Sequence, residues 1–474
     1  MIRAVVLVAG WLLVSGVVGA APLVEKLANL ADQRQLALTV YDDDSALVTD
    51  WRRVNLAAGS NRLVWTDVAA KIRPETVILS NLDAADGLRL LAQDFNFETL
   101  TPQTLLEKNV GKVIMVIRTN PVTGVETREP ATVLAAENGV VLQFGDHIET
   151  AVPGRLAFTA LPDNLSNRPT LVLTVANSEP GQSNLQLSYL TAGLSWHADY
   201  NAVLSAAEDK MALQAWITLS NQSGVDYQHA KLSFVAGDVH NSSQQNSIPA
   251  MQRPMLQLAA MAPLAQENLF EYHLYRLPDA ETLLNQHVLQ VALLSAAWVP
   301  VKKSLELQGT GNYYQASDSD LGAKLRVAVF IEFENKGPGL GVPLPKGTMR
   351  FYQHDSSGNL QFIGADNIAD TAKNQLLRMQ LGDAFDIYAN KKQTDFHKIS
   401  TANNRYEYES AYQILLHNEH DKAVMVKVSE PIPGDWQIID ESLAHRKISS
   451  GVAVWQVPVP AQGEAVLTYR VRVQ

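Results

Sequence analysis

The chain has 474 residues, no cysteine, and 38 Lys and Arg against 49 Asp and Glu, a formal net charge of −11. Without cysteine, disulfides, thiolate metal sites, cysteine nucleophiles and a lipid attached through cysteine are excluded. The acidic balance argues against binding to nucleic acid or to anionic lipid, since both favour basic surfaces. At about 150 residues a domain, the length predicts about three domains, with cores large enough to need no cross-links.

Residues 1–20 predict a secretory signal peptide. Arg3 gives a basic start, Ala4 to Val18 form an apolar stretch, and the segment ends on small residues at Ala20. A retained membrane anchor is the alternative, although the apolar run is shorter than the ~20 residues that span a bilayer. Cleavage would start the mature chain at Ala21 with a net charge of −12, because one of the 38 basic residues is removed. We expect a periplasmic or secreted protein with no stable membrane insertion after cleavage.

Residues 21–103 predict an N-terminal β domain. Gln35 to Tyr41, Ala46 to Val54 and Asn61 to Val68 alternate or cluster apolar residues between turn signals, as hairpin strands do. The acidic triplet Asp42-Asp43-Asp44 is a candidate cation site. Adjacent carboxylates on a tight turn seldom converge on one ion, so a solvated turn is the favoured interpretation.

Residues 104–160 predict a small inserted β-barrel. Short strands at Lys112 to Arg118, Arg128 to Ala136, Val140 to Phe144 and Asp146 to Val152 resemble the pattern of SH3-like or Sm-like barrels. RNA binding does not follow from this likeness, because the chain is acidic and is expected to be exported.

Residues 161–243 predict a β-sandwich. Tyr189, Trp196 and Tyr200 are a candidate platform for stacking a ligand. Large aromatic residues at these spacings in a strand-rich segment more often fill a core, which is the favoured interpretation.

Residues 244–266 predict a linker or mobile loop, because they are rich in Met, Pro and Gln and have no period. Met251, Met255 and Met261 are soft ligands that would suit copper(I). The linker is favoured, since no dense Met or His repeat lies nearby. Deleting Gln244 to Gln266 is expected to leave the fold intact and to weaken a partner interaction.

Residues 267–474 predict a C-terminal β-sandwich region. Composition allows a helix at Glu281 to Ala297, but the alternation there favours strands. A weak internal repeat ends strands on Asn221, Asn335 and Asn418, where the side chain would bond the backbone of the turn. The fold class expected is mainly β, with tandem Ig-like β-sandwich units and the inserted SH3-like barrel.

Several long strings in the chain carry a family resemblance. They are VYDDDSALV, LPDNLSNRPTLV, PLPKGTMRFYQ, GDAFDIYANKKQTDF and EPIPGDWQI. The chain resembles the bacterial family of domain of unknown function 4139 over nearly all of its mature length, and more distantly proteins named for inhibiting mucoidy. The resemblance implies an exported β-rich protein with no established activity. Ala369-Asp370-Thr371-Ala372-Lys373 replaces a string like Asp-His-Thr-Pro-Lys, so chemistry based on that histidine is not expected here.

Chemical motifs are few. HExxH, GxSxG, Walker and GxGxxG patterns are missing from the sequence. His417, Glu419 and His420 form HNEH, a candidate zinc site that matches neither zincin order and is expected on a solvated turn. Asp355 to Asn359 resembles part of a calcium loop but lacks the remaining ligands, which favours a hairpin turn.

The densest carboxylates are Asp366, Asp370, Asp383 and Asp386. Paired carboxylates would serve a glycosidase, whereas capping of turns is the alternative. We assign no catalytic, cofactor-binding or metal-binding residue and expect no cofactor.

Three functional hypotheses remain. The leading one is a non-enzymatic envelope protein that binds an envelope protein or a surface polymer through edges and loops. The alternatives are a carboxylate-dependent hydrolase of cell-wall or surface polysaccharide, and a periplasmic binder of a metal or small ligand.

Overall fold

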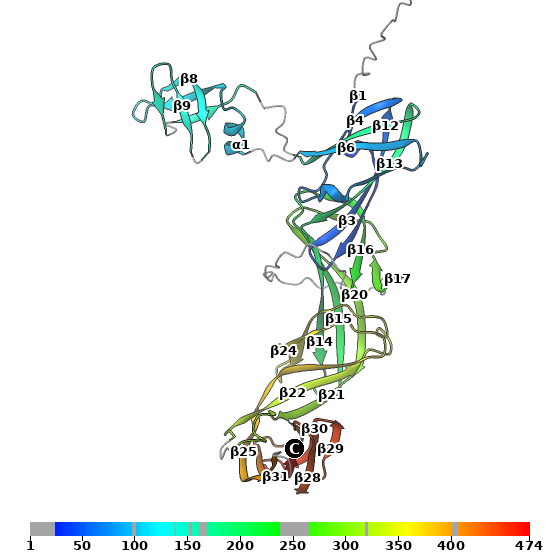
Figure 1. Ribbon diagram of the computed structural model, residues 1–474, viewed down its shortest axis with the longest axis vertical. Helices are drawn as coiled ribbons and strands as arrows, with labels where there is room; N and C mark the ends of the chain where they lie inside the picture. The colour runs from blue at the N-terminus through cyan, green and yellow to red at the C-terminus, as the bar shows by residue number, and fades with distance from the viewer. Residues whose placement is uncertain are drawn as a thin grey trace, which may run out of the picture.

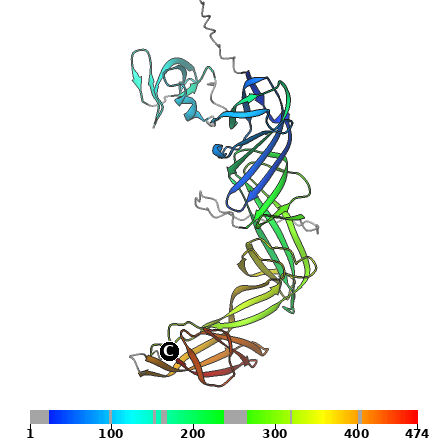
Figure 2. The same cartoon turned by 45° about the vertical axis from the view of Figure 1, so that its right-hand side comes forward.

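The computed structural model describes an elongated protein built almost entirely of strands (Figures 1 and 2). The described residues are 24–96, 101–137, 139–150, 154–160, 168–237, 265–317, 321–400 and 406–474. The expectation of a mainly β fold is confirmed, and among these residues no sheet closes into a barrel. The predicted signal peptide and Met251, Met255 and Met261 lie outside the described residues.

Two sheets form the N-terminal part. The eight-stranded sheet has the order β17-β18-β16-β2-β3-β13-β5, with β19 paired to β16, and the four-stranded sheet has the order β1-β4-β12-β6. The first contains β2 (Gln33–Tyr41), β3 (Ser45–Leu56), β5 (Ile78–Asn81), β13 (Gly181–Ala192), β16 (Tyr227–Ala236), β17 (Ala265–Leu269), β18 (Tyr272–Arg276) and β19 (Glu281–Leu283). The second contains β1 (Val24–Ala28), β4 (Gly59–Thr66), β6 (Leu88–Asn96) and β12 (Thr170–Asn177). Short 3-10 helices η1 (Leu30–Asp32) and η2 (Pro74–Thr76) follow β1 and precede β5.

These two sheets interleave the ranges 21–103 and 161–243, which the sequence pattern separates. β13 pairs with β3 along its whole length, and β12 pairs with both β4 and β6. A linear pattern shows which residues alternate but not which distant strands they join, and these pairings are non-local. The linker expected at 244–266 also ends early, because Ala265 and Gln266 are the first residues of β17 and pair with β18.

The inserted module is a small open sheet. It is set apart from the column that the other sheets form along the long axis of the molecule (Figures 1 and 2). It contains α1 (Pro102–Glu107), β7 (Val113–Thr119), β8 (Glu126–Ala135), β9 (Val141–Gln143), β10 (Ile148–Glu149) and β11 (Arg155–Ala157). Its core is its own, around Val116, Val133 and Phe144. The strand order β10-β9-β8-β7-β11 corrects the expected barrel, since β10 and β11 lie at opposite ends of the sheet and do not pair in its described part. Strands of two or three residues offer too few ladder bonds to close it.

A five-stranded sheet continues the column, in the order β20-β15-β14-β23-β24. Its strands are β14 (Leu194–Leu204), β15 (Lys210–Asn221), β20 (His287–Pro300), β23 (Gly347–His354) and β24 (Leu360–Ile368). The segment 281–297 therefore forms strands, as its alternation predicts, and not the helix that its composition allows.

A nine-stranded sheet forms the C-terminal end, in the order β28-β31-β26-β25-β22-β21-β27-β30-β29. Its strands are β21 (Lys302–Gln308), β22 (Leu325–Glu334), β25 (Leu376–Ser400), β26 (Tyr406–Asn418), β27 (Val424–Pro431), β28 (Trp436–Glu441), β29 (Arg446–Ser449), β30 (Val452–Val459) and β31 (Gly463–Val473).

Two large cores run through these sheets. The main core is shared by the two N-terminal sheets and the five-stranded sheet, and the second lies in the nine-stranded sheet. β22 and β25 contribute to both: Ile331 and Leu377 are in the main core, while Val327 and Ile387 are in the second. The Ig-like character of these sheets stays a prediction.

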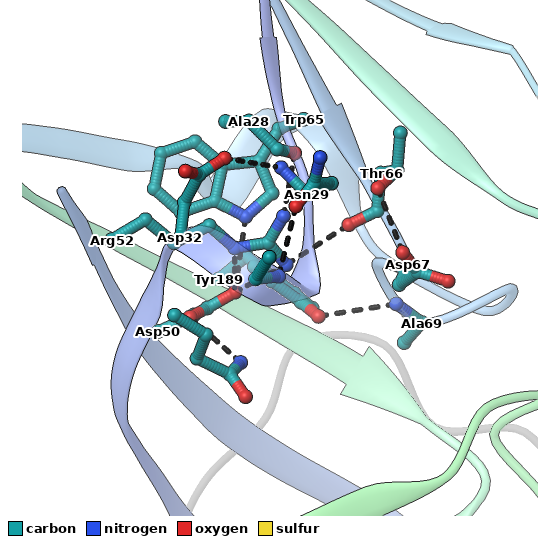
Figure 3. A network of polar contacts seen from close by, with 12 residues as sticks. Ala28, Asn29, Asp32, Asp50, Arg52, Trp65, Thr66, Asp67, Ala69 and Tyr189 are labelled. Carbon is teal, nitrogen blue, oxygen red and sulfur yellow. Dashed lines mark hydrogen bonds and ion pairs between the residues drawn. The ribbon is translucent and has the colours of Figure 1, made fainter. Parts of the chain in front are cut away.

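A buried ion pair joins the two N-terminal sheets (Figure 3). Arg52 of β3 lies 2.7 Å from Asp50, donates to the carbonyl oxygens of Ala28 at 2.6 Å and Thr66 at 2.9 Å, and covers the ring of Trp65 at 4.7 Å. The Trp65 indole also donates to Asp50, at 3.0 Å. The side chains of Arg52 and Asp50 are 0% and 6% exposed and contact both sheets, so we assign the pair a structural role in fixing how the two sheets pack.

The asparagine repeat is confirmed. Asn221, Asn335 and Asn418 are buried at strand ends, and each side-chain amide binds both its own turn and a neighbouring segment. The amide nitrogens donate to the carbonyls of Val225 and Leu283, of Val342 and Ala372, and of Lys422 and Pro460, respectively. The amide oxygens accept from the backbone of Ser223, Gly341 and His420.

Among the described helices, none has the length and hydrophobicity needed to cross a membrane.

Candidate functional site

The three aromatic residues proposed as a platform are part of the main core. Tyr189, Trp196 and Tyr200 are all buried, and the Trp196 ring packs against Tyr275 with centroids 6.4 Å apart. Burial raises the pKa of the Tyr189 hydroxyl, which accepts a hydrogen bond from the backbone of Ala69 at 3.1 Å. No flat aromatic surface is formed by these three.

The four aspartates proposed for a hydrolase make separate contacts. Asp366 accepts from the backbone of Gln380 at 2.8 Å, Asp370 from that of Lys346 at 2.9 Å, Asp383 pairs with Arg326 at 3.2 Å, and Asp386 lies 3.8 Å from His420. These are contacts that stabilise turns and strand pairing. The shallow depression lined by Lys71, Gln222, Gly224, Asn285 and Gln286, with a volume of about 480 Å³, contains no carboxylate or imidazole.

The string GDAFD forms a bulge in β25. Arg326 of β22 pairs with Tyr388 of β25, and Ala328 of β22 pairs with Asp383. Residues 384–387 of β25 therefore have no partner on β22. Phe385 in this bulge is 96% exposed. The bulge lies where β25 passes from one core to the other.

The histidines and the calcium-like loop also have local partners. His417 stacks on Tyr388 with centroids 4.5 Å apart and lies 3.0 Å from Glu464. Asp355 accepts from the backbone of Ser357 and of Asn359, both at 2.9 Å, as in a hairpin turn. Within the described ranges, no three His, Asp or Glu side chains are grouped to hold a metal ion.

The segment PLPKG joins the N-terminal hairpin to the C-terminal half. Lys346 forms an ion pair with Asp42 at 2.8 Å, and the carbonyls of Pro343 and Pro345 accept from Tyr275 at 3.1 Å and Tyr200 at 2.7 Å. Burial raises the pKa of Asp42, and the bond from Lys346 partly offsets this. The turn at 42–44 is thus not simply solvated, because a lysine occupies the position at Asp42 that a cation would take.

The outer face of the five-stranded sheet has a polar network that the sequence analysis did not single out. Residues 198, 200 and 202 of β14 are buried in the core, so the alternate residues His197 and Asp199 point to the opposite face. Arg350 of β23 and Thr218 of β15 both bind Asp199 at 2.7 Å, and His197 lies 3.1 Å from it. Gln290 of β20 donates to Thr218 at 3.0 Å. The bonds therefore cross four adjacent strands, and we call this surface the polar face.

The network keeps Asp199, at its centre, in the charged form. Burial alone would raise the pKa of Asp199, but hydrogen bonds from His197, Arg350 and Thr218 outweigh burial and hold the pKa well below its usual range. Asp199 is therefore a carboxylate at neutral pH, neutralised by Arg350, and is not suited to exchange protons.

Aromatic and amide side chains extend the polar face. Tyr352 and Phe362 pair across β23 and β24 with ring centroids 5.7 Å apart, and Phe362 is 59% exposed. Trp216 of β15, partly exposed, is the partner of Asp199 in the sheet, and Gln214 is exposed beside it. The signal for this face was present as alternation in WHADYN and LQAWITLSN, where every second residue is polar or aromatic.

A model of the domain of unknown function DUF4139 matches residues 185–474, more than half of the chain. The protein belongs to the DUF4139 family. A comparison with curated proteins gave no match. The expected family is confirmed over this range, whereas the strings VYDDDSALV and LPDNLSNRPTLV lie before it.

The DUF4139 range contains the whole polar face but not a complete set of sheets. It begins inside β13, so β2 and β3, which pair with β16 and β13 in the eight-stranded sheet, lie outside it. The ion pair between Lys346 and Asp42 also crosses the boundary. The DUF4139 domain of this protein thus folds against N-terminal strands that the family model does not include.

A second buried network lies in the C-terminal core of the DUF4139 domain. Lys391 of β25 is 2.7 Å from Glu430 of β27, and their side chains are 3% and 1% exposed. Glu430 also accepts from the hydroxyls of Tyr313 and Tyr314, and Tyr314 lies 3.1 Å from the hydroxyl of Tyr469. Burial lowers the pKa of Lys391, against the attraction of Glu430. The network is enclosed in the core, so we treat it as structural.

Proposed function

We propose that this protein is an exported, non-enzymatic envelope protein that binds an envelope protein or a surface polymer through the polar face. The observation that carries the proposal is the hydrogen-bond network from Gln290 to Arg350, which orders polar side chains across four strands. The same surface has solvent-exposed side chains, such as Gln214 and Gln290. Ordered side chains lose little freedom on binding, so a preorganised face favours recognition.

The same network favours binding over hydrolysis. A hydrolase that uses two carboxylates needs one of them to be protonated near neutral pH. The pKa of Asp199 is shifted in the opposite direction, and Asp366 and Asp370 accept hydrogen bonds from the backbone. Asp199 is therefore not prepared to act as an acid, and Asp366 and Asp370 each have a backbone partner of their own.

Site-specific photocrosslinking tests the proposal. We would place a benzophenone amino acid at Gln214 on the polar face, and in a matched variant at the exposed Tyr406 of β26, in cells that export the protein. Benzophenone inserts into C–H bonds, so both proteins and polymers are captured. A defined adduct at position 214 that is missing at 406 is expected, while equal adducts at both positions, or none at 214, would refute a partner on this face.

Export is tested separately by determining the N-terminus of the protein recovered from the periplasm or medium. We expect Ala21 as the first residue. If the protein stays in the membrane with its N-terminus intact, residues 1–20 are a retained anchor and the signal-peptide prediction is wrong.

A further inference from the structure

The polar face has the chemistry of a site for sugar hydroxyls. Resting on the proposed function, we infer that its occupant is an uncharged polysaccharide, which lies across the strands from β20 toward β24. The inference depends on the side-chain types of the face, its charge and its length.

The side chains on the polar face match those of a polyhydroxylated chain. Gln214 and Gln290 are exposed, and their amide groups have both donors and acceptors, as a sugar hydroxyl has. Trp216, Tyr352 and Phe362 add rings that cover the apolar C–H surfaces of a sugar. A surface with mixed amide and aromatic groups differs from the apolar centre of a typical protein interface.

Charge selects an uncharged chain. The carboxylate of Asp199 lies 2.7 Å from the guanidinium of Arg350 and 3.1 Å from the imidazole of His197, so the charges of Asp199 and Arg350 are compensated within the network and neither is left for an ionic polymer. The whole chain has 49 Asp and Glu against 38 Lys and Arg, which disfavours the approach of a polyanion. A neutral chain leaves this ion pair intact and meets no repulsion.

The direction follows from the order of the strands. The hydrogen bonds run from Gln290 on β20 through Thr218 and Asp199 to Arg350 on β23, obliquely across the strands. Five strands spaced about 4.8 Å apart span roughly 19 Å, which accommodates several sugar units. The pair of Tyr352 and Phe362 lies at the β24 end of this path.

The test is isothermal titration calorimetry on the full-length exported protein. The probes are cellohexaose and hexa-N-acetylchitohexaose, which are uncharged, and hexagalacturonate, which is anionic. We expect at least one uncharged hexamer to bind, hexagalacturonate to bind much more weakly, and Gln214→Ala and Phe362→Ala each to weaken binding by about tenfold. Tyr406→Ala, which removes an exposed aromatic ring from the nine-stranded sheet, is the control and should leave the affinity unchanged. The altered residues are exposed, and an unchanged melt will show that each variant folds.

Other outcomes overturn the inference. It fails if neither uncharged hexamer binds, if hexagalacturonate binds as tightly as they do, or if Tyr406→Ala weakens binding as much as Phe362→Ala. A protein adduct at position 214 with no hexamer bound refutes the polysaccharide but keeps the proposed binding function. The absence of both an adduct and hexamer binding refutes the two together.

Discussion

The buried pair of Lys391 and Glu430 allows a quantitative test of how the C-terminal core is held together. Lys391→Met removes the amine 2.7 Å from Glu430 and leaves a carboxylate that is 1% exposed, with hydroxyl donors but no cation. Breaking a buried pair by removing one partner typically costs about 3–5 kcal/mol of the free energy of unfolding. We expect Lys391→Met to fall in this range.

A double variant separates two effects: the loss of attraction between Lys391 and Glu430, and the cost of leaving Glu430 charged and buried without a cation. In Lys391→Met with Glu430→Gln, both charges are removed, and the amide oxygen still accepts from Tyr313 and Tyr314. Since replacing both members of a buried pair is often nearly neutral, we expect the double variant to lie within about 2 kcal/mol of the wild type. It should therefore be more stable than the single variant.

Urea denaturation followed by tryptophan fluorescence measures these values. Trp455 stacks on Tyr469 in the second core, with centroids 4.7 Å apart, so its emission reports the relevant transition. The control is Lys303→Met, which breaks a pair with Glu208 whose side chains are 36% and 37% exposed, and should cost less than about 1 kcal/mol. The reasoning is refuted if Lys391→Met costs no more than this control, or if the double variant is no more stable than the single one.

Four further outcomes are expected. Asn418→Ala should cost about 2–3 kcal/mol, because buried backbone groups lose their partners, whereas Asn359→Ala in an exposed turn should change stability by less than about 0.5 kcal/mol in the same urea assay. The folded pKa of Asp199 lies below the ordinary value of about 3.9, so the stability that Asp199 contributes is complete above that value and is lost as the pH falls through the folded pKa. The difference in melting temperature between the wild type and Asp199→Asn should therefore shrink below about pH 4. A fragment of residues 185–474 should aggregate or bind a hydrophobic dye where the full chain does not, since it lacks β2 and β3, and a monomeric fragment with a cooperative melt would contradict this. Deleting residues 244–264, which spares β17, should leave the cooperative melt unchanged, and a lost melt would place the segment in a core.

Local features of the fold could be predicted from the sequence. Alternation of buried and exposed residues identified strands such as 287–300, and the repeated strand ending identified Asn221, Asn335 and Asn418 as turn residues. Both features depend on neighbours within a few positions, which a linear pattern contains. The pairing of β13 with β3 and of β12 with β4 and β6 could not be read this way, because the paired residues are more than seventy positions apart and are joined across the inserted module.

Candidate sites were harder to predict for the same reason. The aspartates from 366 to 386 are dense in sequence, yet alternation, turns and the bulge at 384–387 direct them to different partners. The polar face gathers Gln290, Thr218, Asp199 and Arg350 from four strands, and only the order β20-β15-β14-β23 brings them together. Sequence proximity was thus a poor guide to convergence, and sheet order determined it.

The two strands shared by both cores also limit how the molecule can move. β25 contains 25 residues, roughly 80 Å if it were straight, and it remains paired to β22 on either side of its bulge. Hinges between domains normally consist of a few unpaired connecting residues, whereas here the connection is a pair of hydrogen-bonded strands interrupted on β25 only at residues 384–387. A change in the separation between the five-stranded sheet and the C-terminal end is therefore expected to be confined to the bulge at residues 384–387, with the paired parts of β22 and β25 moving as units.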